Sequence, residues 1–273
     1  MVVQPSQGCK MMRESSLRVA SCPYGGMSFK LQRGTWRQWE RKRHRGTIND
    51  VLLGVTQVGL CRYLNRGVDA NDGAKNHRSG ALKKMRLRAA VIVNIRPVAG
   101  IQDLADMMVE KSKAKWGNWV GYIILPFPVA LQKDPLKYVR QAKATVDRKK
   151  HSLEAIFTYV CVKLVHNLFG FKAAACITRR VLFNTTLTFS SMPGPVEEIS
   201  FYGHPVAYIA PSAYGLPQAL IIHLTSYANK MTISLSVDPS VIPDPSILCD
   251  DLEESLKLIV DAVQKNLIAN VVV

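Results

Sequence analysis

Residues 183–195 restrict the fold more than any other stretch, because apolar and polar residues alternate along them before a rigid turn. Phe183, Leu187 and Phe189 are apolar, and the positions between them carry mostly hydroxyl or amide groups. A period of two predicts a half-buried strand with a polar second face. The strand has to stop at Pro193-Gly194-Pro195, which neither a helix nor a central strand continues through. Such a strand suits the floor of a polar channel, but the pattern alone favours an ordinary Thr-rich strand with a solvent-facing side.

Helix and strand signals alternate along the rest of the chain. Thr47-Ile48-Asn49-Asp50 fits a capping box at the head of a buried helix, and Asp134-Pro135 and Asp244-Pro245 mark two further helix starts. Helical character also covers 153–169 and 173–180, interrupted at Gly170. Strands are predicted over 85–95, 116–126, 220–224 and 231–237, with a hairpin-like turn at 203–204. This mixture predicts an α+β fold, an α/β sandwich in which helices cover a mixed sheet.

The chain is strongly basic, and half of its excess charge lies in residues 1–46. The formal net charge is +16, and ten lysines and arginines against two glutamates give this segment +8. Anionic partners such as nucleic acid, a membrane surface or a phosphorylated small molecule are compatible with that charge. The segment has no hydrophobic period, so we expect a disordered basic tail. The six cysteines show no metal-ligand spacing, and Cys61 and Cys161 lie in apolar runs, which is typical of buried, reduced thiols.

None of the six histidines belongs to a sequence motif for metal binding or nucleophilic catalysis. His223 lies in a predicted strand, on the face shared with Thr225 and Tyr227, and could reach a polar channel. A structural histidine with satisfied hydrogen bonds is nevertheless the favoured interpretation. No apolar signal-peptide core follows Met1, and prolines interrupt the long uncharged spans 116–132 and 199–229. We therefore expect neither secretion nor a membrane-spanning segment.

Seven short segments occur in an order that resembles a known family. They are GTINDVLLGV (46–55), VNIR (93–96), WGN (116–118), DRKK (147–150), SMPGP (191–195), TSY (225–227) and IPDP (242–245). Together they look like the carboxy-terminal half of plant-type wax ester synthase/diacylglycerol acyltransferases. The resemblance covers about residues 47–268, which would form one domain, with 1–46 as a non-family segment.

The resemblance implies a fold similar to chloramphenicol-acetyltransferase-like, CoA-dependent acyltransferases. It also implies O-acyl transfer from acyl-CoA, as substrate, to diacylglycerol or a long-chain alcohol, giving triacylglycerol or wax ester without a cofactor or metal. Residues matching the family's motifs would be structural or line the substrate tunnel, with His223 as a further tunnel-facing candidate. These residues are Asn49, Asp50, Arg96, Gly117, Asn118, Ser191, Pro193, Gly194 and Pro195, with Ser191 and Met192 replacing Asn and Val of the family pattern.

The family's catalytic histidine lies in an HHxxxDG motif of its amino-terminal half, and neither that motif nor the PLW motif occurs in this chain. We therefore expect a truncated half with no catalytic residue of its own, so whether it is an enzyme stays open. The alternative is a non-catalytic lipid- or partner-binding module. The resemblance implies a peripheral position on the cytoplasmic side of the endoplasmic reticulum or plasma membrane, and no nucleic-acid partner.

Overall fold

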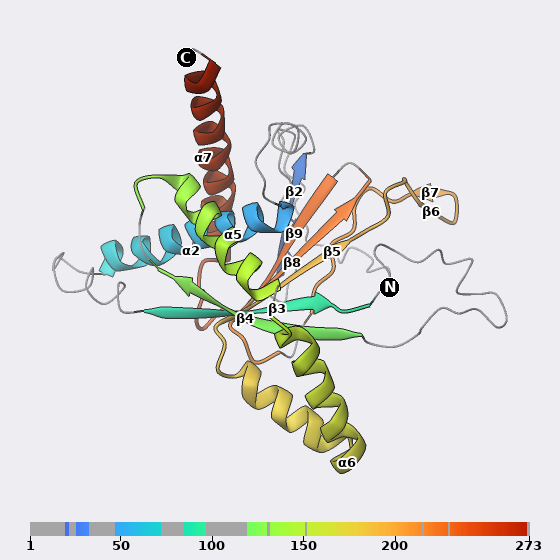
Figure 1. Ribbon diagram of the computed structural model, residues 1–273. Coiled ribbons are helices and arrows are strands. Elements are labelled where there is room, and N and C mark those ends of the chain that lie inside the picture. Colours follow the sequence, from blue (N-terminus) through green and yellow to red (C-terminus); the bar gives the residue numbers. More distant parts are fainter. Residues whose placement is uncertain are drawn as a thin grey trace.

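A seven-stranded mixed sheet organises the computed structural model of the protein (Figure 1). The structure describes residues 20–21, 26–32, 47–71, 85–96, 119–129, 132–150, 152–213, 216–228 and 230–271. The elements are β1 (Ala20–Ser21), β2 (Gly26–Gln32), α2 (Ile48–Asn71), β3 (Arg86–Asn94), β4 (Val120–Pro128), α5 (Pro135–Lys150), α6 (Glu154–Leu182), β5 (Leu187–Pro193), β6 (Ser200–Phe201), β7 (His204–Pro205), β8 (Leu220–Tyr227), β9 (Lys230–Val237) and α7 (Pro245–Val271). The predicted α+β class is confirmed.

The strands of the large sheet follow the order β1-β2-β9-β8-β5-β3-β4. Strand β5 is parallel to both of its neighbours, β3 and β8, whereas the remaining pairs are antiparallel. Parallel neighbours need crossover connections, and α6 together with the 194–219 segment provides them. The polar strand predicted from the sequence therefore lies in the interior of the sheet.

Helices α2, α5 and α7 pack over one face of the sheet and enclose the hydrophobic core (Figure 1). Leu187 and Phe189 of β5 and Leu252 and Ile259 of α7 are buried there. An ion pair joins α2 to α7, because the fully buried Asp251 carboxylate lies 3.5 Å from the Nε of Arg62. Burial of that carboxylate is tolerable only with such a cationic partner.

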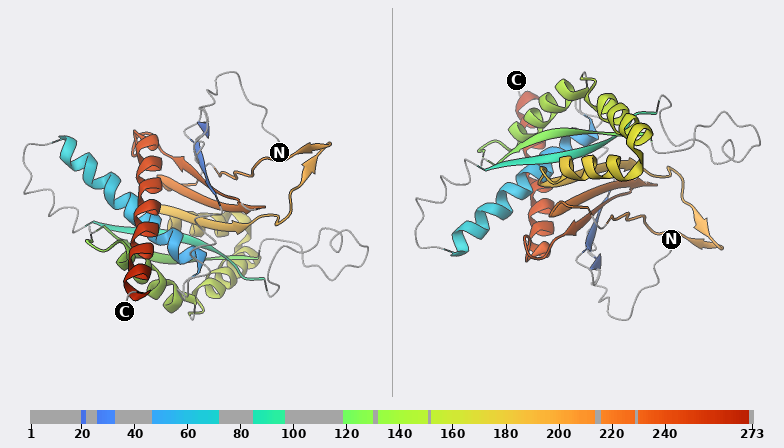
Figure 2. Two further views of the ribbon diagram at one scale, coloured as in Figure 1. Left: turned by 90° about the horizontal axis from the view of Figure 1, so that it is seen from above. Right: turned by 90° about the horizontal axis from the view of Figure 1, so that it is seen from below.

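Helix α6 lies on the other side of the sheet and covers the edge strand β4 (Figure 2). Glu154 accepts a hydrogen bond from the backbone N–H of Ile124 at 2.9 Å, and Thr158 accepts one from that of Tyr122 at 3.2 Å. A Cβ at Gly121 would lie 2.1 Å from the backbone oxygen of Ala155, so glycine is required for this approach. Side chains of α6 thus satisfy backbone donors that an open sheet edge would expose.

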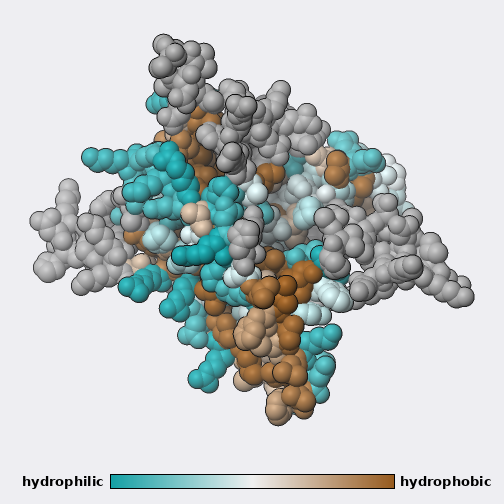
Figure 3. All heavy atoms as spheres, in the orientation of Figure 1, coloured by the Kyte–Doolittle hydropathy of each residue, from teal (hydrophilic) through white to brown (hydrophobic). Residues whose placement is uncertain are grey.

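Beyond its first turns α6 extends into solvent, and its surface there is apolar (Figure 3). Gly170, with φ 79° and ψ 177°, divides the helix into two legs, as its sequence predicted. By length and composition α6 is the one described helix that could cross a membrane, although such a single helix is weak support for a span. The sequence-based expectation of no spanning segment did not consider this helix.

The crossover between β5 and β8 carries a two-stranded arm, β6–β7, which projects from the body (Figure 2). Tyr202 and Gly203 occupy its turn with φ of 49° and 79°, the left-handed values typical of a tight hairpin turn. A hairpin is therefore present where the sequence predicted one, but its turn lies at 202–203, one residue before the predicted 203–204, and His204 begins β7.

Three sequence-based expectations need correction. Phe183 and Asn184 end α6 rather than begin the strand, since their backbone N–H groups bond to carbonyls of the preceding helical turn. Cys161 is half-buried, unlike the buried Cys61, because it lies on the exposed part of α6. Within the expected disordered tail, residues 26–32 form β2 and pair with all of β9 except its last residue. Met27, Phe29 and Leu31 alternate with polar residues in β2, a pattern that the high positive charge of residues 1–46 made easy to miss. The rest of 1–46, apart from Ala20 and Ser21, lies outside the described residues.

Candidate functional site

The face of the sheet opposite the α2–α5–α7 layer is polar where β5, β8 and β9 meet. In the register of these strands, Ser190 of β5 is the partner of His223 on β8, and His223 is the partner of Ser234 on β9. Two residue pairs further along, Thr225 is the partner of Thr232. Side chains in register on neighbouring strands share a face, so these residues form one continuous surface, hereafter the polar face.

The polar face is buried, yet most of its polar atoms have no hydrogen-bond partner among the described residues. Ser190 and Ser234 are 6% and 3% exposed. Unbonded groups on this face are the hydroxyls of Thr188, Thr225, Thr232, Ser234 and Ser236 and both ring nitrogens of His223. A buried polar group without a partner costs free energy, and each such group in a native protein needs an explanation. Their concentration on one face indicates a surface that binds a polar ligand or a further protein segment.

His223 is the one histidine among the described members of this surface. Burial lowers the pKa of His223 below its ordinary value, because removal of water disfavours the charged imidazolium. The neutral ring has one donor nitrogen and one acceptor nitrogen. Neither is bonded to any described residue, so the expectation of a structural histidine with satisfied hydrogen bonds is wrong. The prediction that it shares a face with Thr225 and Tyr227 agrees with the alternation of β8.

Tyr227 marks the end of the polar face and joins it to the arm. Its hydroxyl accepts a hydrogen bond from the backbone N–H of Ile199 at 2.9 Å. The hydroxyls contributed by β9 were not proposed from the sequence, which showed them only as the outward positions between Met231, Ile233 and Leu235. Their alternation was the available signal, but only the sheet order places them beside His223.

The motif residues Asn49 and Asp50 have different environments. Asn49 is exposed, whereas Asp50 is fully buried at the start of α2. The Asp50 carboxylate accepts hydrogen bonds from the backbone N–H of Thr47 at 2.6 Å and from its hydroxyl at 2.8 Å. Asp50 therefore closes the predicted capping box, and neither residue lies on the sheet strands that form the polar face.

Arg96 and the WGN motif belong to none of the strands β5, β8 and β9. Arg96 is half-buried just after β3, and its backbone N–H donates to the side chain of Asn94 at 3.1 Å. Gly117 and Asn118 lie outside the described residues. A tunnel-lining role for these three residues stays a prediction.

The SMPGP motif is a point of close backbone contact. Gly194 follows β5 and runs beside β8, where a Cβ on it would lie 2.0 Å from the backbone oxygen of Ser226. Its N–H donates to the hydroxyl of Ser226 at 3.2 Å, and the Pro195 carbonyl accepts from Ala228 at 2.8 Å. Pro193 is the last residue of β5. Ser191 is half-buried and in register with Leu224, on the alternate positions to Ser190, so it does not share the polar face.

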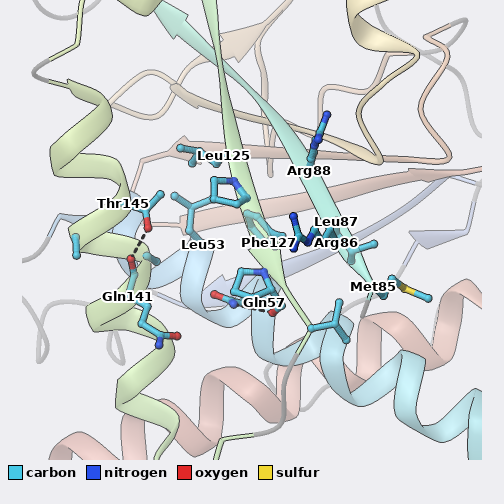
Figure 4. Close-up of a pocket in the computed structure, with 15 residues that line it drawn as sticks. Leu53, Gln57, Met85, Arg86, Leu87, Arg88, Leu125, Phe127, Gln141 and Thr145 are labelled. Atoms are coloured by element: carbon cyan, nitrogen blue, oxygen red, sulfur yellow. Dashed lines mark hydrogen bonds between the residues drawn. The ribbon is translucent and has the colours of Figure 1, made fainter. Parts of the chain in front are cut away.

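A separate cleft of about 730 Å³ lies between the β3–β4 hairpin and helices α2 and α5 (Figure 4). Leu53, Leu125 and Phe127 line it, and the amide of Gln57 is already bonded to the Pro128 carbonyl at 2.9 Å. Figure 4 shows Arg88 directed away from Gln57. None of the residues proposed from the sequence lines this cleft. We therefore take the polar face, and not the cleft, as the candidate site.

The chain is clearly related to curated plant proteins. It is 58% identical over 219 residues to wax ester synthase/diacylglycerol acyltransferase 5 of Arabidopsis thaliana, covering 80% of this chain and 43% of the relative. Wax ester synthase/diacylglycerol acyltransferase 11 of the same plant is 56% identical over 217 residues, covering 80% of this chain and 44% of the relative. The chain therefore spans less than half the length of these relatives.

Solved structures share the fold at low sequence identity. A wax ester synthase/diacylglycerol acyltransferase from Marinobacter aquaeolei VT8 superposes with a TM-score of 0.55 at 18% identity, over 86% of this chain and 48% of the other. A condensation-domain structure from the enacyloxin polyketide synthase gives a TM-score of 0.50 at 14% identity, over 86% of this chain and 41% of the other. The predicted fold class is confirmed. The sequence profile of the WS/DGAT C-terminal domain also matches residues 116–260, just over half of the chain. The chain therefore belongs to the wax ester synthase/diacylglycerol acyltransferase family and contains its carboxy-terminal domain.

Proposed function

We propose that this chain supplies the carboxy-terminal part of an acyl-CoA-dependent O-acyltransferase, with diacylglycerol or a long-chain alcohol as acceptor. The polar face around His223 would form one wall of its reaction channel. The observation that carries the proposal is the group of buried, unbonded polar atoms on β5, β8 and β9 in a chain of this family. Such a surface is suited to hydrogen bonding with the polar part of a substrate once a second wall encloses it.

In the proposed reaction the acceptor hydroxyl oxygen bonds to the thioester carbonyl carbon, and the carbon–sulfur bond of acyl-CoA breaks. The hydroxyl proton passes to a base and then to the departing thiolate, giving the ester and free CoA. The family's base motif, HHxxxDG, does not occur in this chain, so the base would come from another part of the enzyme. His223, held neutral by burial, would both donate and accept hydrogen bonds and so position the substrate. Acyl-CoA is a substrate of this reaction, and the reaction needs no cofactor.

A chimera tests this function. Residues 47–273 replace the corresponding part of wax ester synthase/diacylglycerol acyltransferase 5 of Arabidopsis thaliana, which shares 58% identity. Free CoA release is measured, and the ester product is identified by chromatography. We expect turnover by the chimera with diacylglycerol or a fatty alcohol, and none above the heat-treated control for this chain alone, because it lacks the base motif.

The controls separate misfolding from loss of function. The parent plant enzyme has to be active in the same assay, and the chimera has to melt cooperatively. A folded chimera that releases no CoA would contradict the proposal and support a non-catalytic lipid- or partner-binding module. Turnover by this chain alone that is abolished in His223→Ala would instead make His223 a catalytic base.

A further inference from the structure

The two legs of α6 meet at an exposed apolar apex. Leu168, Phe169 and Phe171 flank Gly170, and the two phenylalanines are 72% and 74% exposed. Figure 3 shows this region as a hydrophobic projection from the lower end of the molecule, with hydrophilic residues beside it. Contiguous exposed apolar surface of this kind marks an interaction site in a soluble protein.

The hydrogen bonds described between α6 and the rest of the fold lie at the two ends of the helix. Glu154 and Thr158 bond to the backbone of β4, and Tyr159 stacks on Trp119 with ring centroids 5.8 Å apart. Further along the first leg, Val160, Leu164 and Leu168 are all more than half exposed. The apolar apex therefore projects beyond an anchored base.

The charges of α6 are almost all positive. It carries Lys163, Lys172, Arg179 and Arg180, and its one acidic residue, Glu154, forms an ion pair with Lys149 of α5. Lys163 lies on the first leg and Lys172 directly beyond the apex on the second. Long basic side chains beside an apolar projection are suited to contact with anionic headgroups while the apolar residues enter the acyl region.

The kink argues against a straight membrane crossing. Gly170 divides the 29 residues of α6 into legs of 16 and 12. At the helical rise these legs are about 24 and 18 Å long, each shorter than a bilayer hydrocarbon core of about 30 Å. Both legs also return to the same sheet, at β4 and at β5 (Figure 1). A shallow insertion of the apex fits this geometry, and a span does not.

We propose that the α6 apex binds the surface of an anionic phospholipid bilayer, with Phe169 and Phe171 inserted and Lys163 and Lys172 at the headgroups. Anionic lipid is concentrated in the cytoplasmic leaflet, so the protein is peripheral on the cytoplasmic side of its membrane. This places the acyltransferase domain beside a source of apolar acceptors. The inference does not depend on turnover by this chain.

The test is flotation of the purified chain with vesicles of phosphatidylcholine, with and without phosphatidylserine. We expect binding that is stronger with phosphatidylserine and weaker at high salt. The double change Phe169→Asp and Phe171→Asp should lower the partition coefficient roughly tenfold or more, since it removes the inserted apolar surface. Lys163→Gln with Lys172→Gln should remove most of the preference for phosphatidylserine.

Two matched controls define the site. Phe201→Asp with Tyr202→Asp makes the same change on the exposed β6–β7 arm, and Lys257→Gln with Lys265→Gln removes two exposed charges from α7. Both should bind like the parent, and all variants should keep the parent's melting temperature. Unchanged binding of the apex variant, or no binding by the parent, would overturn the proposal. Concentration-dependent dimerisation that the apex variant loses, without vesicle binding, would also overturn it and assign the surface to a second copy of the chain.

Discussion

His223 and Ser234 lie in register across the antiparallel β8–β9 pair, and neither side chain has a hydrogen-bond partner in the part of the chain that the structure describes. Ser234 is almost fully buried. A protein that only had to be stable would place apolar residues at such positions, because a buried hydroxyl without a partner costs about 1–3 kcal/mol. Substitutions in this pair should therefore affect stability and the proposed function in different directions.

Ser234→Ala should leave the unfolding free energy of the chain unchanged or raise it by about 1 kcal/mol, because it removes an unbonded buried hydroxyl. In the active chimera the same change should lower CoA release, by about tenfold if the hydroxyl contacts the reacting groups. Denaturant unfolding and the CoA assay measure the two effects. The matched control is Ser255→Ala, which removes a buried hydroxyl that donates to the Asp251 carbonyl and should cost about 1 kcal/mol. Destabilisation by both changes alike would show that the polar face is merely structural.

His223 should make stability depend on pH. Its pKa is lower in the folded than in the unfolded chain, so below about pH 6.5 the unfolded state binds more protons. The contribution of His223 to stability is then fully present above that pH and is lost as pH falls toward the folded pKa. His223→Asn should reduce the acid-side fall in melting temperature, whereas His204→Asn, on the exposed arm, should leave it unchanged. Parallel pH profiles for the parent and His223→Asn would contradict a neutral, buried imidazole.

Gly194→Ala should destabilise the fold by about 1–3 kcal/mol, since the added Cβ would lie 2.0 Å from the Ser226 backbone oxygen. Thermal unfolding monitored by circular dichroism measures this loss. Gly203→Asn is the matched control, because nothing lies within 4 Å of a Cβ there and Asn tolerates its positive φ. A melting temperature for Gly194→Ala equal to that of the parent would mean that β5 and β8 can separate locally without cost.

Asp50→Ala should cost about 0.5–2 kcal/mol, because it removes the acceptor that caps α2 at Thr47. The neighbouring Asn49→Ala is the natural comparison, since Asn49 is exposed and its loss should change stability by less than about 0.5 kcal/mol. Equilibrium denaturation measures the unfolding free energy of both variants and so shows which of the two motif residues is structural. Equal stability losses would contradict this division.

Most of the local structure and the family could be predicted from the sequence. Capping signals at Thr47, Asp134 and Asp244 marked helix starts because capping bonds, such as that from the Leu136 N–H to the Asp134 carboxylate, join groups only a few residues apart. The period of two placed Thr188 and Ser190 on the second face of a strand for an equally local reason, since successive side chains point to opposite sides. The order of the seven motifs predicted the family, which the relatives confirmed.

Strand order, which appears first in the folded protein, determines which polar positions form the candidate site. Thr188 and Ser190 look like an ordinary solvent-facing row until β5 is placed in the sheet interior beside His223 and Ser234, which are distant in sequence. Local periodicity carries no information about strand order, so it could not distinguish a solvent face from a buried one. The same holds for α6, because its local pattern predicts helix but does not show that its apolar residues form an exposed apex, where Gly170 turns the chain back toward the sheet.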